Sequence, residues 1–459
     1  MRNASRRRVR DLAFIAFLAA FFALGFKRPF LLVLAYVYID IVSPQRLTYL
    51  LLNTVPISLI AVALAVGGWV IADDKRDTRV APRQVLIVVL LLYCWATTLA
   101  ADFPVEAKEK WDWVWKALAF AAFLPLTLRT RLRIESLLLF MVLSAASIII
   151  VGGIKTLATG GGGYGQLNLM VDNNSGLYEG STISAVAVAI IPIILWFMRH
   201  GTIFKPDRRV QVFCIALVFA CLLIPVGTST RTGLLCIGLL AILSLRVVKR
   251  KVLYLGALAT LGLIAIPFLP STFTNRMNTI KTYQADESAS TRIAVWQWTI
   301  DYARSHPFGG GFEAYRGNRI RYDLAGAEGG AAPGKVEEDK ARAYHSAYFE
   351  MLGEQGYFGL ALWLLLNVAG LVRMEVLRRR YADPDGAFAW AGPLAAALQS
   401  GHLVYLLGAA FIAIAFQPFI YMLLGAQIGL DTYLTRKRRE ASFRSMRQTR
   451  DPAHGALPV

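Results

Sequence analysis

Long apolar runs recur from one end of the chain to the other, and their length limits the fold more than any other feature. Most runs approach the 20 residues that an α-helix needs to cross a bilayer. Of the 459 residues, 56% are hydrophobic and only 17% are charged. Soluble domains rarely reach this balance, so the sequence predicts an all-α, polytopic membrane protein. The runs fall near residues 12–26, 29–42, 54–72, 85–101, 112–128, 134–157, 182–198, 209–226, 231–248, 252–270, 346–372, 387–410 and 412–433.

Short basic loops between the runs predict which helix ends face the cytoplasm, because short loops on that side retain Lys and Arg. This rule leaves residues 102–111, 158–181, 227–230 and 271–345 on the outer face. The longest, 271–345, carries ten Lys/Arg against nine Asp/Glu, which suits a translocated loop. The cytoplasmic clusters are Lys75/Arg76/Arg79/Arg83, Arg129/Arg131/Arg133, Arg199/Lys205/Arg208/Arg209, Arg246/Lys249/Arg250/Lys251, Arg373/Arg378/Arg379/Arg380 and a basic tail after Leu434.

The first three runs do not fit this alternation of sides. If all three crossed, the N-terminal segment with its five arginines, which we interpret as uncleaved, would lie outside. We therefore expect residues 12–42 to make one net crossing as a broken or partly interfacial helix at Pro29. This gives about 12 transmembrane helices with both ends cytoplasmic, and 13 spans is the alternative. The expected units are a membrane bundle at 1–270, a periplasmic loop with short helices at 271–345, membrane helices at 346–434 and a basic cytoplasmic tail at 435–459.

The formal net charge of +19 follows from the basic loops. It indicates contact with anionic membrane lipid and not with nucleic acid, because the basic residues lie between membrane spans. The cysteines lie in apolar runs and are most simply small buried hydrophobes. Their spacing suggests neither a disulfide framework nor a metal site, so no metal or cofactor is expected. They are Cys94, Cys214, Cys221 and Cys236.

The polar island at 271–345 carries several candidate functional residues. Ser290 is a reasonable helix N-cap, and the apolar residues after it recur at helical spacing, which predicts an amphipathic helix ending at His306-Pro307. Arg292 would lie in its first turn, where a cation needs a nearby anion such as a phosphate. A solvated charge is the ordinary alternative. Gly309-Gly310-Gly311 permits a tight turn or a backbone nest for anions.

Three further ionisable residues lie at the predicted outer edge of the membrane. Arg231 stands between two apolar runs, where an arginine usually faces a polar cavity or a partner, or else extends to the interface. His345 ends the long loop and can accept a proton near neutral pH, although a lone histidine is more often structural. Glu354 follows inside an apolar run as a second base, a cavity carboxylate or a cap.

Together these segments resemble the O-antigen ligase and polymerase superfamily of bacterial envelope glycosyltransferases. No single motif is specific, but three in order, all predicted on the outer face, are. The first similar segment is Ser229-Thr230-Arg231-Thr232-Gly233-Leu234. The second is Ser290-x-Arg292 with Trp296 and His306-Pro307-Phe308-Gly309-Gly310-Gly311-Phe312. The third is His345-Ser346-Ala347-Tyr348-Phe349 with Glu354-Gln355-Gly356-Tyr357-Phe358-Gly359. Within the superfamily, Asp172-Asn173-Asn174 and Arg28-Pro29-Phe30 are similar to the exosortase-associated O-glycosylation ligase branch, although the segment after Asn174 departs from its pattern.

The resemblance implies a GT-C-like, metal-independent membrane glycosyltransferase of the cell inner membrane, with its active site on the periplasmic face. The donor would be a glycan on undecaprenyl diphosphate, and the acceptor a hydroxyl of lipid A–core in lipopolysaccharide, of a protein or of another glycan. Arg231 and Arg292 would bind the diphosphate, and His345 would activate the acceptor. The expected substrate-binding residues also include Gly309, Gly311, Tyr348 and Glu354.

Two other functions remain open at this point. A polymerase that joins repeat units of O-antigen or exopolysaccharide would share every motif quoted. A transporter or flippase for lipid-linked glycan belongs to a different class, and it would place ionisable residues in the middle of the membrane. Here the notable polar residues gather toward one face, which favours the enzyme.

Overall fold

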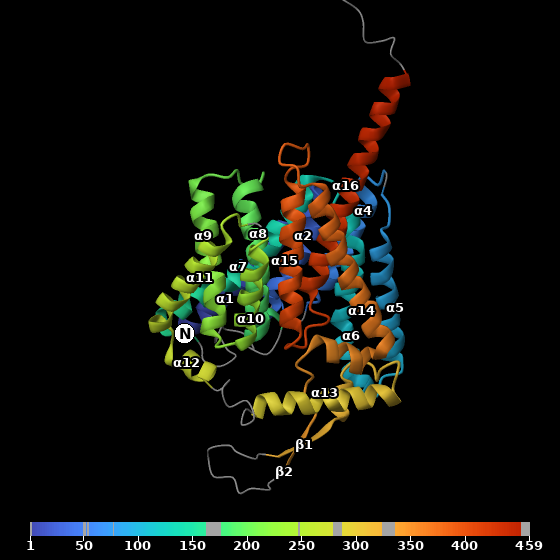
Figure 1. Cartoon of the computed structure of the whole chain (residues 1–459). Helices are drawn as coiled ribbons and strands as arrows, with labels where there is room; N and C mark the ends of the chain where they lie inside the picture. The colour runs from blue at the N-terminus through green and yellow to red at the C-terminus, as the bar shows by residue number, and fades with distance from the viewer. Residues whose placement is uncertain are drawn as a thin grey trace, which may run out of the picture.

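The computed structural model describes residues 2–48, 52, 55–76, 78–161, 176–246, 248–278, 287–323 and 336–450 (Figure 1). The predicted all-α architecture is confirmed, with one small exception in the long loop. The helices are α1 (Arg2–Lys27), α2 (Phe30–Val42), α3 (Pro44–Leu47), α4 (Ile57–Ala72), α5 (Pro82–Leu99), α6 (Pro104–Thr127), α7 (Arg131–Thr159), α8 (Gly180–His200), α9 (Arg208–Gly227), α10 (Arg231–Ser244), α11 (Lys251–Ala265), α12 (Ser271–Asn278), α13 (Glu287–Ser305), α14 (Ala347–Arg380), α15 (Ala391–Ala409) and α16 (Pro418–Arg450), and the strands are β1 (Arg319–Asp323) and β2 (Val336–Lys340).

Among the described residues, five helices are long and apolar enough to cross a membrane by length and composition: α5, α7, α8, α9 and α14. In the most apolar 18 residues of α8, 78% of the residues are buried. Helix α8 packs mainly against α9 and α15. In α9 only 33% is buried, and Val212, Ile215 and Phe219 expose one apolar side. An apolar face without a protein partner suits contact with lipid chains. Therefore α8 is a central helix of the bundle, whereas α9 lies at its periphery.

Local sequence signals explain where several helices begin. Pro82 and Pro104 occupy the first positions of α5 and α6, where the missing N–H costs no helical hydrogen bond. Asp207 accepts a hydrogen bond from the backbone of Val210 and caps α9. The Glu179 carboxylate accepts from the Ser181 and Thr182 amides at the start of α8. These caps satisfy the free amides of helices that begin at the surface of the bundle.

The first two helices correct the expectation for residues 12–42. The rings of Phe17 in α1 and Tyr38 in α2 lie 5.1 Å apart, so the chain reverses at Arg28-Pro29 and α2 returns along α1. A helix that continued through a break would separate these rings by roughly 30 Å. One helix that runs on through a break at Pro29 is therefore wrong, whereas the number of membrane crossings made by residues 12–42 stays a prediction. The proline forms part of a tight reversal instead of bending one helix.

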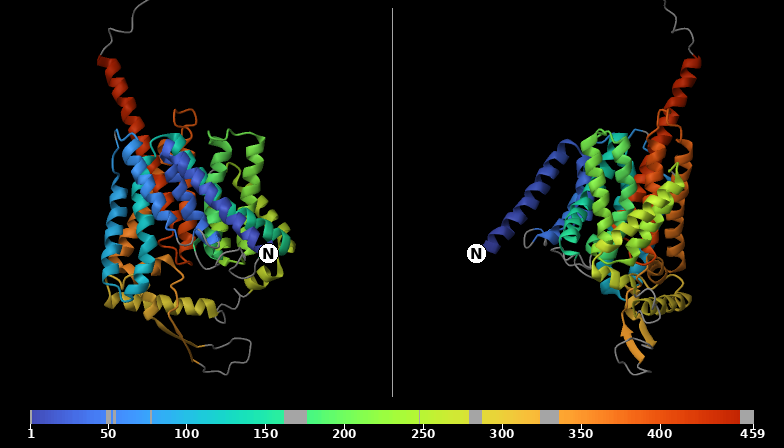
Figure 2. Two further views of the ribbon diagram at one scale, coloured as in Figure 1. Left: turned by 180° about the vertical axis from the view of Figure 1, so that it is seen from behind. Right: turned by 60° about the vertical axis from the view of Figure 1, so that its left-hand side comes forward.

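The long loop covers one end of the bundle. Helix α13 lies crosswise beneath the ends of the other helices, and β1 and β2 project beyond it as an antiparallel hairpin (Figures 1 and 2). The predicted loop helix and its end before His306-Pro307 are confirmed. Its predicted start is wrong, because α13 begins at Glu287 and Ser290 is inside it. The strands were not predicted, because their charged residues give no apolar alternation.

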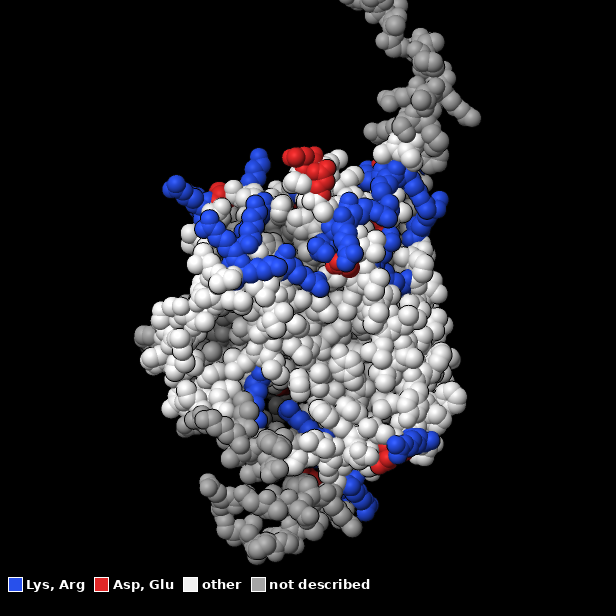
Figure 3. All heavy atoms as spheres, viewed as in Figure 1, with Lys and Arg blue, Asp and Glu red and all other residues white. Residues whose placement is uncertain are grey.

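The opposite end of the molecule is rich in arginine and lysine. Figure 3 shows these side chains gathered at the end where α16 extends away from the bundle, with few on the apolar middle. The four cysteines are buried, as predicted, and each is a free thiol. An apolar belt with one basic end is the charge pattern that the sequence suggested.

Candidate functional site

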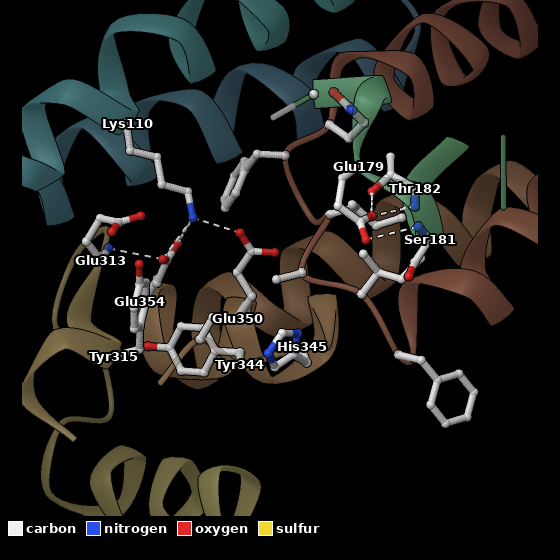
Figure 4. Close-up of a pocket in the computed structure, with 18 of the residues that line it drawn as sticks. Lys110, Glu179, Ser181, Thr182, Glu313, Tyr315, Tyr344, His345, Glu350 and Glu354 are labelled. Atoms are coloured by element: carbon white, nitrogen blue, oxygen red, sulfur yellow. Dashed lines mark hydrogen bonds and ion pairs between the residues drawn. The ribbon is translucent and has the colours of Figure 1, made fainter. Parts of the chain in front are cut away.

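A cavity of about 880 Å³ lies at the end of the bundle that α13 covers (Figure 4). Its walls come from α6, the start of α8, α13, the start of α14 and the connection between α15 and α16. The walls mix charged side chains with apolar ones from the α15–α16 connection, such as Phe416. Such a mixture suits a ligand with both polar and apolar parts.

His345 lines this cavity and lies two residues before the start of α14. Its backbone has φ 47°, a left-handed conformation that is uncommon outside glycine and often marks functional positions. The side chain is exposed to the cavity, and the surrounding protein lowers the pKa of His345 by desolvation. The positive charge of Arg292 lowers that pKa further, against a smaller opposing effect of Glu179. The imidazole is therefore held neutral and able to accept a proton at neutral pH.

Arg292 lines the same cavity from α13. Because α13 begins at Glu287, Arg292 lies in its second turn and not in the predicted first turn. One turn further on, the indole N–H of Trp296 donates to the Tyr344 carbonyl at 2.8 Å, and its ring stacks on Phe349 at 4.9 Å. These contacts fasten the arginine-bearing part of α13 to the start of α14.

The cavity wall has two further cations, and both have carboxylate partners. Lys110 pairs with α14, and Arg316 pairs with Glu313 at 3.1 Å. Arg292 has no carboxylate within ion-pair distance among the residues that the structure describes. Its charge is thus available to an anion in the cavity.

A buried ion cluster forms the inner wall of the cavity. The Lys110 ammonium of α6 donates to Glu350 at 2.7 Å and to Glu354 at 2.8 and 2.9 Å (Figure 4). Glu350 also accepts from the Ala415 amide at 2.9 Å, and Glu354 from the Glu313 amide at 3.0 Å. Two carboxylates one turn apart on an apolar helix need such a partner. Of the three roles considered for Glu354, the geometry favours a buried cavity carboxylate.

The predicted glycine nest lies behind this cluster. The amide of Gly311 donates to the Glu354 carbonyl at 2.9 Å, and that of Gly309 donates to the His306 carbonyl at 2.9 Å. The turn fits against α14 where Gly356 departs from helical geometry, with φ 63° and ψ −168°. A Cβ on Gly309 would lie 2.4 Å from the Glu354 carbonyl oxygen. These amides already have acceptors, so the glycines fasten the loop to α14 and do not line the cavity.

Arg231 and Tyr348 also lie outside the wall of this cavity. Arg231 begins α10 directly after Thr230, whose hydroxyl contacts that of Ser184 at 3.0 Å. Ser184 is one turn along α8 from Ser181, a wall residue, so Arg231 starts close to the rim. The Tyr348 hydroxyl donates to the Leu406 carbonyl at 3.2 Å and joins α14 to α15.

Sequence reasoning missed Lys110, Glu350, Glu313 and Glu179. A usable signal existed for Glu350, because it lies four residues before Glu354 in an apolar run, and two such carboxylates predict a buried cation. No local pattern selects Lys110 from its charged neighbours. The Asp172-Asn173-Asn174 motif lies outside the described residues. No three His, Cys, Asp or Glu side chains in the described part of the chain are grouped as metal ligands.

Comparison with protein families gives two matches. Residues 216–364 match the model of a family described as O-Antigen ligase, and residues 9–202 match one described as Family of unknown function (DUF5935). No protein of curated function matches the chain. The first match runs from α9 through the long loop into α14, so it includes Arg231, Arg292 and His345. It confirms the relation to the O-antigen ligase and polymerase superfamily and indicates a membrane enzyme of glycan assembly.

Proposed function

We propose, from the O-antigen ligase domain at residues 216–364, that this protein transfers a glycan from undecaprenyl diphosphate to an acceptor hydroxyl. The observation that carries the proposal is the common cavity of Arg292 and His345. A cation that has no carboxylate partner in the described part of the chain and a neutral imidazole meet there, as expected for a site that joins an anionic leaving group to a hydroxyl nucleophile.

The reaction assigns each group one task. Neutral His345 accepts the proton of the acceptor hydroxyl while that oxygen forms a bond to the anomeric carbon. The bond from the anomeric carbon to the phosphate oxygen breaks, and undecaprenyl diphosphate leaves with the electron pair. Arg292 and Arg231 stabilise the diphosphate charge, which requires the long side chain of Arg231 to reach the cavity from its rim. The leaving group is already stable, so positioning supplies much of the remaining acceleration.

The buried cluster supports this chemistry without taking part in proton transfer. Lys110 holds both Glu350 and Glu354 in ion pairs, so Glu354 is not the first candidate for the base. The cluster fixes the inner wall between α6 and α14 and compensates the charge of Lys110. In this proposal Lys110 is a positioning residue.

The proposed orientation places the cavity and residues 271–345 at the periplasmic face of the inner membrane. The arginine-rich end in Figure 3 then faces the cytoplasm, in agreement with the positive-inside rule. The cavity lies near one end of the bundle, because Lys110 and Glu354 are within two or three turns of the ends of α6 and α14. A site at one face supports an enzyme over a transporter, whose substrate sites lie near the bilayer midplane.

The test is incubation of the purified full-length protein with undecaprenyl-diphosphate glycan and candidate acceptors. We expect release of undecaprenyl diphosphate together with a glycosylated acceptor. A single addition indicates a ligase, and a ladder of products indicates a repeat-unit polymerase. Arg292→Ala should reduce transfer to a small residual rate, with only partial recovery in Arg292→Lys.

Arg304→Ala is the matched control, because Arg304 lies on the same helix, is exposed and pairs only locally with Asp301 at 2.8 Å. It should retain the wild-type rate. Transfer by Arg292→Ala at the wild-type rate would remove Arg292 from the site, and movement of intact donor across a vesicle membrane without product would favour a transporter.

A further inference from the structure

A second cavity, of about 670 Å³, lies at the arginine-rich end of the bundle, opposite the end that α13 covers. It is formed by the segment before α5, the end of α6, α14 and the part of α16 that leaves the bundle. Six arginines and two carboxylates line it, together with apolar residues such as Val80 and Leu126. A strong excess of positive charge inside a recess differs from a row of solvated arginines on a surface.

Asp431 organises the floor of this cavity. Arg373 donates to both of its oxygens at 2.8 Å, and Arg83 donates through Nη2 at 3.0 Å. One carboxylate therefore accepts hydrogen bonds from two guanidinium groups, through both of its oxygens. The trio carries a net positive charge that Asp431 does not compensate.

Two polar atoms on the cavity wall, Arg83 Nη1 and the Thr78 hydroxyl, make no hydrogen bond within the described part of the chain. Arg83 is 7% exposed, and its Nη1 makes no hydrogen bond to any protein atom that the structure describes. The hydroxyl of Thr78 is likewise buried without a partner. A buried guanidinium N–H and a buried hydroxyl that lack partners each cost free energy. Their presence on the wall of one positive cavity indicates a missing anionic ligand.

We infer that this cavity binds a phosphate group, with Arg83 Nη1 and the Thr78 hydroxyl as buried donors and exposed Arg439 at the mouth. A phosphate oxygen accepts from guanidinium and hydroxyl groups alike, which suits this donor set. The adjoining apolar wall fits the acyl region of an anionic phospholipid, and basic pockets between membrane helices are typical headgroup sites. A soluble phosphate shares the same chemistry, and the experiment distinguishes these two sources.

The experiment titrates full-length protein in neutral detergent with dihexanoyl phosphatidylglycerol, dihexanoyl phosphatidylcholine and inorganic phosphate by calorimetry. We expect saturable binding of phosphatidylglycerol and much weaker binding of phosphatidylcholine, which has no net charge. Arg83→Gln should weaken binding by about tenfold or more, because a charge-assisted hydrogen bond is lost. Thr78→Val keeps the shape of the side chain, leaves the ion pairs of Asp431 intact and should weaken binding by a smaller factor.

Arg208→Gln is the control, because Arg208 is exposed at the same basic end, at the start of α9, and does not line the cavity. It should bind as the wild type does. If inorganic phosphate binds as tightly as phosphatidylglycerol and competes with it, the site is supported and its ligand is a soluble phosphate. If phosphatidylglycerol binds and inorganic phosphate does not, the ligand is the lipid. The inference is overturned if folded Thr78→Val and Arg83→Gln proteins bind phosphatidylglycerol like the wild type. Equal affinity for phosphatidylcholine, or no saturable binding of any of the three probes, overturns it too.

Discussion

At the scale of single residues, the cavity near α13 sets the protonation state of His345 by its surroundings. Desolvation and the charge of Arg292 both lower the pKa of His345, so the neutral form persists below the usual histidine range. A neutral imidazole is the form that a general base requires. His345 also adopts a left-handed backbone, which directs its side chain into the cavity ahead of the α14 helix.

Replacement of His345 by glutamine tests the assignment of the base. His345→Gln should retain donor affinity and lose transfer by roughly 10²–10⁴-fold, because proton acceptance is removed while a polar side chain remains. Donor affinity and single-turnover rate are measured separately on protein whose folding is checked by thermal unfolding. A stable variant with the wild-type rate would exclude His345 as the base.

The pH dependence of transfer follows from the lowered pKa of His345. Protonation at low pH removes the base, so kcat/KM should fall as pH drops through a value below 6.5, the ordinary histidine pKa. Arg292→Gln removes a charge that lowers the pKa, so the acid limb of its residual activity should move to higher pH. The measurement is kcat/KM against pH for both proteins. An acid limb that stays at the same pH would contradict the pairing of Arg292 with His345.

Lys110 is expected to matter more for stability than its position on the wall suggests. Lys110→Met leaves two buried carboxylates without their cation and should lower the free energy of unfolding by roughly 3–5 kcal/mol. The additional change Glu354→Gln should restore part of the loss. Lys108→Met is the control, since Lys108 is exposed on the same helix. Denaturant unfolding in detergent checks all three, and a Lys110→Met protein as stable as the control would show that the cluster is dispensable.

At the scale of helices and turns, the start of α14 is the element that the site depends on. Its irregular residue Gly356 meets the turn after α13, and the Tyr357 amide donates to the Pro307 carbonyl at 2.9 Å. This contact decides where α13 ends relative to α14. The sequence predicted both helices and permitted either a tight turn or an anion nest at the glycines, and the family resemblance favoured the nest. The partner of a backbone amide depends on which segments meet, and residue spacing does not contain that information.

Gly356→Ala should disrupt this contact. A Cβ at that position would lie 2.2 Å from the Pro307 carbonyl oxygen, and the backbone conformation is one that alanine rarely adopts. We expect a loss of roughly 3 kcal/mol or more in stability together with a loss of transfer. Gly238→Ala in α10 meets no atom within 4 Å and should be neutral or slightly stabilising. Unchanged unfolding of the Gly356→Ala protein would show that the turn can detach without cost.

At the scale of the whole molecule, the apolar runs predicted nearly every long helix because membrane helices require continuous apolar sequence. The reversal between α1 and α2 escaped prediction, since Pro29 is compatible with a break and with a tight connection. The grouping of Arg292 and His345 was expected, whereas the contribution of Lys110 was not. Its pairing joins α6 to α14 across more than 200 residues, and such long-range contacts follow from packing alone.

The orientation of the molecule is tested by cysteine accessibility in cells. The native cysteines are buried and should give little background labelling. Arg304→Cys, on α13, should react with a membrane-impermeant reagent from the outside, and Arg76→Cys, before α5, should react only after permeabilisation. Both native residues are exposed. The reverse pattern would place the His345 cavity in the cytoplasm and remove the proposed donor from reach.

The crosswise placement of α13 makes it a lever arm. The fixed point of this lever is the turn Gly309-Gly310-Gly311, which follows Ser305 and is hydrogen-bonded to α14. Arg292 lies 13 residues before Ser305 along the helix, about 20 Å from that end. A tilt of only about 5° at the fulcrum would swing the guanidinium by nearly 2 Å, roughly the difference between a hydrogen bond and none. The contacts of Trp296 with Tyr344 and Phe349 restrain the part of α13 that carries Arg292. The position of Arg292, the arginine proposed to bind phosphate, is thus set at a turn that does not line the cavity.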